Sequence, residues 1–521
     1  MSSNFLLCIM FSKVYSGAVF GLNAYRIEVE VDISPGNLAT YLTVGLPDAS
    51  VKESESRVKS AIINSGFRFP FNKRVTVNLA PADIKKEGSA FDLPIAAAIL
   101  NTLGHLDKDK LKNHLLLGEL ALDGRIKSVK GSLPIAIMAK SLGAKGIILP
   151  LDNASEAAVV SGINIYPIES LPQAIEFLSG NIQIEPAVIN TKQNSQQNPN
   201  YPIDFADVKG QQHVKRALEV ACAGGHNLIM IGPPGSGKSM LAKRLMTILP
   251  KMSFEESLET TKIHSIMGLV KPGNGLATAR PFRSPHHTIS DAGLIGGGHI
   301  PTPGEVSLTH NGILFLDELP EFKRHVLEVM RQPLEDGHVT ISRAISSLTY
   351  PASFMLVAAM NPCPCGYKTD PKRECGCTSM QIKKYVSRIS GPLFDRIDIH
   401  VEVPTLKYQE LRSNYGGEKS EQIRKRVSKA REIQQQRFSK ENIYCNAKIT
   451  TNQLKKYCKI DCQSEKIMEL AINKLGLSAR AYDRILKVSR TIADLAGDQN
   501  IKQEHLSEAI QYRTLDRENW Y

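Results

Sequence analysis

The residues best suited to chemistry stand at positions 232–239, where the chain reads GPPGSGKS. This run matches G-x-x-x-x-G-K-[ST], follows the apolar run NLIMI and precedes the helical pattern MLAKRLMTIL. Its glycines let backbone N–H groups curl around a phosphate, and the start of the following helix adds its positive dipole end. Lys238 is then expected to reach the β and γ phosphates of a nucleotide, while the Ser239 hydroxyl ligates Mg²⁺. The predicted nucleotide-contacting residues are Gly232, Pro233, Pro234, Gly235, Ser236, Gly237, Lys238, Ser239 and Met240.

Two later apolar runs end in polar side chains suited to nucleotide hydrolysis. ILFLDE ends in Asp317, which can hold Mg²⁺, and in Glu318, which can polarise an attacking water. FMLVAAMN ends in Asn361, a neutral amide that can orient that water without competing for the metal. An acidic pair after a strand, or an Asn before a proline, often marks only a turn. Their order behind a phosphate loop favours the catalytic interpretation.

Four of the nine cysteines cluster close behind Asn361. They form two C-x-C pairs separated by a polar loop that carries Gly, Pro and Lys, and they are Cys363, Cys365, Cys375 and Cys377. Four thiolates can hold a tetrahedral Zn²⁺ with no open coordination position, so the expected role is structural. Because C-x-C is tighter than the usual C-x2-C, reduced thiols, an iron–sulfur cluster and disulfides remain alternatives.

The elements that must position these residues divide the chain by composition. Residues 10–180 mix alternating apolar stretches with small-residue helical ones, as expected of an α+β domain, and residues 181–203 form a polar linker rich in Asn and Gln. Residues 204–405 alternate strand-like runs with helical segments, which predicts a parallel sheet with crossover helices. From about Tyr408 the strands stop, and residues 406–521 are charged and helical in pattern.

Composition narrows the class of protein. A chain of 521 residues exceeds what one core usually serves, and no apolar run approaches the roughly 18 residues of a membrane span. The first residues lack a basic lead and a cleavage site, so a cytoplasmic protein with reduced cysteines is expected, starting at Met1 or at Met10. The net charge of +12 permits attraction to nucleic acid.

In this order, the phosphate loop, the acidic pair and Asn361 resemble an AAA+ ATPase, which implies ATP and Mg²⁺ as cofactors. In that family an arginine reaches the γ phosphate bound by the neighbouring subunit. The segment SRISGPLFDRIDIHVEVP resembles the region that carries this finger, with Arg396 as the first candidate and Arg388 as the second. Arg480, in GLSARAYDRIL, resembles the sensor on the helical lid.

Two insertions point to one clade of that family. The segments 280–312 and 338–353 are similar to the helix-2 insert and the pre-sensor hairpin of the clade that holds magnesium chelatase and the minichromosome maintenance helicases. In ring-forming members these insertions face the central pore, where arginines can meet DNA phosphates. The arginines in question, which otherwise serve as ordinary surface residues, are Arg343 on the hairpin and Arg280 and Arg283 on the longer insert.

The adjacent pair His286 and His287 invites a metal interpretation. Adjacent histidines point in different directions on most backbones, and the sequence nearby offers no matching pair of ligands. Loop polarity is the better explanation.

Longer phrases extend the resemblance over nearly the whole chain from Met10. KVYSGAVFGLNA, VGLPDASVKESESRVKSAI, FRSPHHTIS, PGEVSLTHNGILFLDELPEF and RISGPLFDRIDIHVEVP are similar to the ComM/YifB family of magnesium-chelatase-like AAA+ ATPases. The resemblance implies an ATP-driven hexameric ring that binds DNA and supports branch migration during integration of transforming DNA.

The first domain resembles the proteolytic domain of Lon, a ribosomal protein S5 domain 2-like fold, and so raises the rival function of a protease. The nearest match to the Lon nucleophile motif is EGSAFD, which places Ala90 at the serine position, and Leu133 falls at the position of the lysine base. Ser89 is one residue out of register, which on a helix turns its hydroxyl by about 100°. Lys127 and Lys130 lie nearby in the sequence. A scaffold without the Ser/Lys dyad, kept for binding or assembly, is the favoured interpretation.

The predicted fold is therefore α/β, with a P-loop AAA+ core and a C-terminal helical lid behind a Lon-protease-like α+β domain. The predicted activity is that of an ATP-hydrolysing motor, a cytoplasmic homo-hexamer without membrane contact that acts on single-stranded or branched DNA. The alternatives are a chelatase-type motor subunit and a protein-remodelling ATPase without DNA activity.

Overall fold

The computed structural model describes residues 11–35, 40–83, 85–188, 201–299, 301–343, 347–370, 372–406, 417–441 and 443–515. The chain divides into two compact units, Met1–Gln197 with Phe254–Ala277 and Asn198–Ser253 with Thr278–Tyr521. The two candidate start residues, Tyr408 and residues 189–200 of the predicted linker lie outside the described residues.

The first unit is built on a seven-stranded sheet in the order β3-β4-β2-β1-β5-β8-β9. β1 and β2 pair antiparallel, as do β2 and β4, while the remaining neighbours pair in parallel. The strands are β1 (Phe11–Phe20), β2 (Asn23–Pro35), β3 (Thr40–Val44), β4 (Lys73–Ala80), β5 (His114–Leu116), β8 (Gly146–Pro150) and β9 (Asn164–Ile168). A separate small hairpin joins β6 (Glu119–Leu120) to β7 (Ile126–Lys127).

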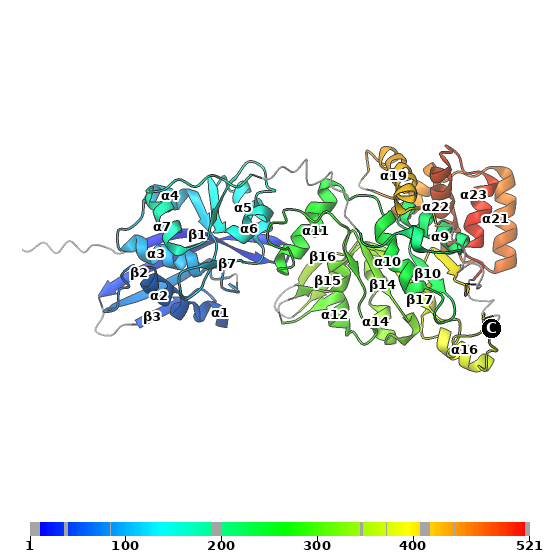
Figure 1. The fold of residues 1–521 in the computed structure, drawn as a ribbon, viewed down its shortest axis with the longest axis horizontal. Helices are drawn as coiled ribbons and strands as arrows, with labels where there is room; N and C mark the ends of the chain where they lie inside the picture. Colours follow the sequence, from blue (N-terminus) through cyan, green and yellow to red (C-terminus); the bar gives the residue numbers. More distant parts are fainter. Residues whose placement is uncertain are drawn as a thin grey trace, which may run out of the picture. The chain divides into compact units, whose positions relative to one another are not determined.

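Helices pack on this sheet (Figure 1), and the core between them is built mainly from small and branched side chains. The run DLPIAAAIL is buried along its whole length in α3, because its alanines let the helix lie close to β1 and β2. The helices of this unit are α1 (Ala49–Lys52), α2 (Ser54–Asn64), α3 (Asp92–Thr102), α4 (Lys108–Asn113), α5 (Ser132–Ser141), α6 (Leu151–Ala157), α7 (Leu171–Ser179) and α11 (Phe254–Ile266). Helix α11 lies in the range predicted for the ATPase core but packs against α5, and the Gly131 N–H donates to the Ser265 carbonyl at 3.1 Å.

The second unit contains a five-stranded sheet in the order β11-β14-β17-β10-β18, with every pair parallel. The three apolar runs seen in the sequence form its buried central strands, β10 (Leu228–Ile231), β14 (Ile313–Leu316) and β17 (Met355–Met360). A strand covered on both faces needs apolar residues at every position, which explains these unbroken runs. The outer strands are β11 (Phe282–Arg283) and β18 (Ile399–Glu402). The predicted parallel sheet is confirmed.

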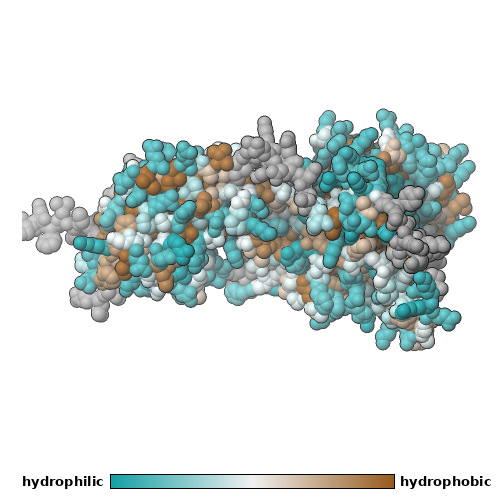
Figure 2. Space-filling model, viewed as in Figure 1, coloured by the Kyte–Doolittle hydropathy of each residue, from teal (hydrophilic) through white to brown (hydrophobic). Residues whose placement is uncertain are grey.

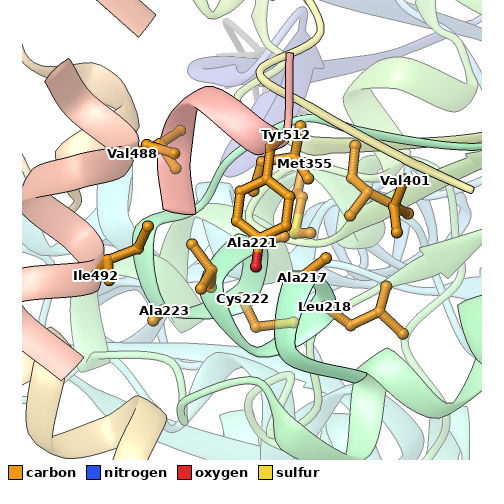
Figure 3. Packing of buried hydrophobic residues seen from close by; sticks show 14 of the residues in the cluster. Ala217, Leu218, Ala221, Cys222, Ala223, Met355, Val401, Val488, Ile492 and Tyr512 are labelled. Atoms are coloured by element: carbon orange, nitrogen blue, oxygen red, sulfur yellow. The ribbon is translucent and has the colours of Figure 1, made fainter. Parts of the chain in front are cut away.

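Crossover helices and the carboxy-terminal helices share one hydrophobic core with this sheet. Figure 3 shows α9 residues Ala217, Leu218 and Ala221 packed between Val401 and Met355 of the sheet and Val488 and Ile492 of α22. The flanking helices are α9 (Gln212–Gly224) and α10 (Lys238–Ile248). From residue 417 onward the described chain is helical, in α19 (Ser420–Arg437), α20 (Thr451–Tyr457), α21 (Cys462–Leu475), α22 (Ala479–Ala496) and α23 (Gln503–Gln511).

Short elements fill the two insertions and the loops behind the strands. The second insertion is an antiparallel hairpin of β15 (His338–Ser342) and β16 (Ser347–Pro351), as the sequence predicts. The remaining elements are α12 (Asp291–Ile295), β12 (Gly296–Gly297), β13 (Thr302–Pro303), α13 (Glu305–Leu308), α14 (Arg324–Glu328), α15 (Arg331–Asp336), α16 (Ser379–Val386), α17 (Gly391–Phe394) and the 3-10 turns η1 (Phe205–Asp207), η2 (Leu319–Glu321) and η3 (Asn446–Lys448).

The surface is mainly polar. Figure 2 shows hydrophilic side chains predominating on the face in view, with hydrophobic ones scattered in small groups. Among the helices of the described ranges, none combines the length and the apolar character needed to cross a membrane.

Candidate active site

The phosphate loop runs from the end of β10 to the start of α10, as its sequence pattern predicts. Gly235 and Gly237 have φ angles of 75° and 93°, a left-handed region that favours glycine. Gly232 is required for another reason, because a Cβ there would overlap the Val403 carbonyl oxygen. The loop thus turns tightly between a strand and a helix start, which is the geometry that cradles phosphate.

The Lys238 ammonium lies inside this loop. It donates to the carbonyls of Gly232 and Pro233 at 2.7 and 3.0 Å, and to the Asn361 Oδ1 at 3.2 Å. Burial lowers the pKa of Lys238, while Asp317 and Glu318 act in the opposite direction. A polyanion bound in the loop would favour the charged form, so this environment fits the phosphates of a nucleotide.

Two further features of the loop support that fit. The Ser236 hydroxyl is buried and has no partner among the described residues, so it can donate to a phosphate oxygen. The Gln211 amide, which sequence reasoning missed, donates to the carbonyls of Ser236 and Pro404 at 3.1 and 3.0 Å and braces the loop from the start of α9.

The acidic pair follows β14 at the same edge of the sheet. The Ser239 hydroxyl donates to the Asp317 Oδ2 at 2.5 Å, which brings together the two side chains predicted to hold Mg²⁺. Glu318 has a left-handed φ of 52°, rare for a residue with a side chain, and its own side chain is 58% exposed. The backbone therefore turns directly after the strand and directs the Glu318 carboxylate away from the core, where it can meet a water.

Asn361 takes its position from the sheet topology. β17 lies between β10 and β14, so Asn361, the residue that follows it, is placed between the phosphate loop and the acidic pair. The Asn361 Oδ1 meets the Lys238 ammonium at 3.2 Å. The sequence order of the three elements does not show this, because the third strand in the chain lies second in space.

The finger candidates differ in their surroundings. The Arg396 side chain is only 7% exposed, is ion-paired with Glu335, and donates to the Pro392 carbonyl. The Arg388 side chain is 50% exposed and pairs with Glu321 at 2.7 Å. Both intersubunit roles stay predictions, and Arg388 is the more accessible of the two in a single chain.

The lid arginine predicted from the sequence is Arg480, which lies exposed in the first turn of α22. One turn later Arg484, which sequence reasoning missed, makes the contact between this helix and the sheet. Its guanidinium pairs with the buried Asp398 and donates to the Arg396 carbonyl at 3.1 Å. Only the fold could reveal this pair, because 86 residues separate its members.

The histidine pair of the long insertion also has an unexpected position. The His287 Nδ1 lies 3.8 Å from the Glu318 Oε2, and its ring meets Phe322 edge-on at 6.4 Å between ring centroids. The His286 ring lies against the His287 ring in a tilted arrangement, with 4.1 Å between ring centroids. Because both segments lie near the ends of neighbouring strands β11 and β14, this insertion reaches the residue predicted to activate water.

Comparison with known proteins agrees with this geometry. Residues 204–411 match the family described as magnesium chelatase, subunit ChlI, residues 417–513 match its C-terminal family, and residues 29–153 match the family described as subunit ChlI of Mg-chelatase. The competence protein ComM of Haemophilus influenzae is 46% identical over 506 residues, and the match covers 97% of each chain. The protein YifB of Escherichia coli is 44% identical over 509 residues, with 97% of each chain covered.

The chain belongs to the ComM/YifB family of magnesium-chelatase-like AAA+ ATPases. The predicted fold class is therefore confirmed, with a P-loop AAA+ core and a helical lid. A partial match to Lon protease 2 of Bacillus subtilis, 31% identical over 160 residues and covering 28% of each chain, accords with the Lon-like domain.

In this ComM/YifB protein the residues compared above with the Lon dyad make other contacts. Ser89 donates to the Glu119 carboxylate, which lies 3.7 Å from the Lys127 ammonium. Leu133, at the position of the Lon base, is fully buried in α5. Lys130 extends along Gly268 instead. Ser89 therefore meets a carboxylate rather than the lysine that a Ser/Lys dyad needs.

The three arginines of the two insertions also differ in their surroundings. The Arg283 guanidinium forms a two-pronged ion pair with Glu305 at 2.6 Å, and Arg280 donates to the carbonyls of Pro250 and Asn311 at 2.8 Å. Both hold the insert in shape. Arg343, at the end of β15, is exposed and donates to the Gly298 carbonyl at 3.3 Å, so it is the arginine best placed to meet a ligand.

The four clustered cysteines come together in space. The Cys363 Sγ lies 3.3 Å from the Cys365 Sγ and 3.6 Å from the Cys375 Sγ, and all four sulfur atoms lie within 4.8 Å of one another. All four are free thiols. This places them on the loop that directly follows Asn361.

Proposed function

We propose that this protein is an ATP-hydrolysing motor that acts on DNA as a homo-hexameric ring in the cytoplasm. The observation that carries the proposal is the convergence on one sheet edge of the Lys238 ammonium, the Ser239–Asp317 pair and Asn361. This set can bind a magnesium nucleotide and stabilise charge on a transferred phosphoryl group. Bound Mg–ATP would supply that group and the neutralising cation.

The chain's own residues divide the work of hydrolysis. Lys238 neutralises the β and γ phosphates, and Ser239 with Asp317 orients the cation. Glu318 accepts the proton of the attacking water, and Asn361 fixes the position of that water beside the γ phosphate. Arg388 or Arg396 completes the charge of the site in the neighbouring subunit, which makes hydrolysis depend on ring assembly.

The net charge of the chain and its similarity to a known protein support DNA as the partner. The chain carries a net charge of +12, and Arg343 lies exposed at the end of a hairpin strand. The H. influenzae relative bears the name competence protein, which points to a role in DNA uptake or integration. Single-stranded or branched DNA is the proposed substrate, gripped mainly through its phosphates.

We also propose that Zn²⁺ is held by Cys363, Cys365, Cys375 and Cys377. The sulfur atoms of Cys363, Cys365 and Cys375 lie 3.3 to 3.6 Å apart, close to the edge of about 3.8 Å for thiolates placed about 2.3 Å from a zinc ion, and the Cys377 sulfur lies within 4.8 Å of them. The role is structural, since four thiolates leave no open position.

Steady-state ATPase measurement against single-stranded, duplex and branched DNA at low salt tests the proposal. Wild type should be stimulated by at least one DNA form, Lys238→Ala should lose nucleotide binding, and Glu318→Gln should bind ATP but lose turnover. Lys243→Ala, an exposed lysine on the same helix α10, serves as the matched control and should behave as wild type. An ATPase indifferent to all three DNA forms would refute the DNA role, and normal turnover by Glu318→Gln would refute the site assignment.

A further inference from the structure

The cysteine loop lies directly on the phosphate loop. Gly366, which follows Cys365, has a left-handed φ of 87° and is buried. A Cβ at Gly366 would lie 2.6 Å from the Pro234 Cδ and 3.9 Å from the Asn361 Cγ. Two parts of the nucleotide site, the phosphate loop and the sensor amide, thus share this one contact with the cysteine loop.

The position of Gly366 is set by the cysteines on either side of the turn. The Gly366 N–H donates to the Cys363 carbonyl at 3.0 Å, and Gly366 directly follows Cys365. The sulfur atoms of Cys363 and Cys365 lie 3.3 Å apart, so a metal held by both would fix the turn that carries Gly366.

The charges around the cluster suit a metal thiolate. Four thiolates on Zn²⁺ carry a net charge of −2, and the intervening loop contributes Lys368, Lys372 and Arg373 against Asp370 and Glu374, a net charge of +1. Arg373 is itself held by the Tyr367 ring at 5.0 Å and by the Tyr367 hydroxyl at 2.8 Å. Cys363 is fully buried, which excludes water from one side of the site.

We infer that zinc at the four cysteines fixes one wall of the ATP site, so that metal occupancy sets the affinity for ATP. The inference rests on the proposed ATP binding and adds that zinc occupancy regulates the affinity for ATP. Zinc closes the loop from Cys363 to Cys377 onto a single centre and removes most of its conformational freedom. Gly366, next to a ligand, then holds Pro234 and Asn361 in the arrangement that accepts phosphate. Loss of the metal frees the loop and loosens the phosphate site without touching a nucleotide contact.

Substitutions at two glycines of this loop distinguish the effect of the Gly366 contact on ATP binding from the effect of the metal. Gly366→Ala introduces a side chain at positive φ and against Pro234, which should weaken ATP binding at least about tenfold while zinc remains bound. Gly376→Ala is the matched control, because a Cβ at that position meets nothing within 4 Å and the residue lies between two cysteines of the same loop. It should keep both zinc and ATP affinity.

The experiment measures zinc by elemental analysis of full-length protein purified without chelator, equilibrium binding of a fluorescent ATP analogue, and the thermal midpoint. About one zinc per wild-type chain, normal binding by Gly376→Ala and weakened binding by Gly366→Ala support the inference. Cys375→Ser provides a second variant, which should lose zinc and bind the analogue at least about tenfold more weakly. If Gly366→Ala also loses zinc, Cys375→Ser decides the outcome.

Three results would overturn the inference. They are less than half an equivalent of zinc in wild type, an iron–sulfur absorption band or a disulfide in its place, and wild-type ATP affinity in Cys375→Ser after zinc loss. Wild-type affinity for the ATP analogue in a zinc-loaded Gly366→Ala protein would equally contradict the claim that the Gly366 contact controls ATP binding. A wild-type protein that binds zinc but no ATP would instead refute the proposed function, so the two failures are distinguishable.

Discussion

Asp398→Asn should destabilise the second unit, because Asp398 joins three of its parts. Its carboxylate pairs with Arg484 of the lid, accepts from the Asn227 N–H at 2.9 Å just before β10, and lies 3.5 Å from the His226 Nδ1. The Asp398 side chain is only 5% exposed, and the Arg484 side chain is 22% exposed. An Asn at this position leaves an arginine without its counter-charge and turns an amide N–H toward other donors.

Removing one partner of a buried ion pair costs about 3–5 kcal/mol, and the partial exposure of Arg484 places this case near 3 kcal/mol. For a unit of this size that corresponds to a fall in thermal midpoint of roughly 5 °C. Burial raises the pKa of Asp398, but Arg484 and His226 outweigh burial and hold that pKa well below its usual range. Because the folded-state pKa is the lower one, the stabilisation is present at neutral pH and is lost as the pH falls below about 4.

Thermal unfolding of wild type, Asp398→Asn, Arg484→Met and the double variant between pH 7 and about pH 3 provides the test. The double variant should lose less stability than the sum of the single variants, by about 1 kcal/mol or more. Glu421→Gln, which removes an exposed pair with Lys425, is the control and should leave the midpoint unchanged. A midpoint within about 2 °C of wild type for Asp398→Asn, or strict additivity in the double variant, would refute the reasoning.

The remaining predictions concern the ring, the insertion and DNA. The Arg388→Ala and Arg396→Ala variants should each bind ATP normally. The variant that removes the true finger should lose about a hundredfold or more in turnover and should regain activity when it is mixed with Lys238→Ala subunits. If mixing restores no activity, the arginine has no intersubunit role. Arg396→Ala should in addition lower the thermal midpoint, since Arg396 is buried against Glu335. The His287→Ala variant should raise the basal ATPase rate up to about fivefold, because a partly exposed contact of about 0.2–1 kcal/mol no longer restrains Glu318. An unchanged ratio of DNA-stimulated to basal rate would count against this restraint. Arg343→Ala should weaken binding to all DNA sequences alike and reduce the slope of log affinity against log salt by about one, and an unchanged slope would contradict a phosphate contact.

Prediction from the sequence succeeded where chemistry is local to a short segment. The phosphate loop pattern carries its own strand, turn and helix start, and unbroken apolar runs identify strands buried on both faces. It failed for β11 and β18, which are short and stand at the sheet edges, so their residues show no strong pattern. It gave no sign that α11 packs against α5, because the buried residues of α11 are mostly polar and form no hydrophobic stripe.

The functional residues missed by sequence reasoning share one property. Gln211, Arg484 and His287 act on groups 25 to 193 residues away in the chain, and each belongs to a residue type common on any surface. Nothing in the local pattern separates a bracing glutamine or a buried arginine from a solvated one. His287 alone carried a signal, since it lies a few residues after the strand next to β14, but only the strand order gives that signal meaning.

By itself the sequence determined the kind of chemistry. Glycines that permit a left-handed turn, a lysine and a serine at a helix start, and carboxylates behind a buried strand require no long-range information, because each depends on its neighbours in the chain. The tertiary structure decided which groups meet. The insertion of β17 between β10 and β14 brings Asn361 to Lys238 and lays Gly366 against Pro234. It also decided that four cysteines, which the sequence left open between metal, free thiols and disulfides, form one cluster on the loop that contacts the phosphate loop. The physical reason is that pairing of parallel strands sets contacts between residues more than a hundred positions apart, and no local propensity encodes that distance.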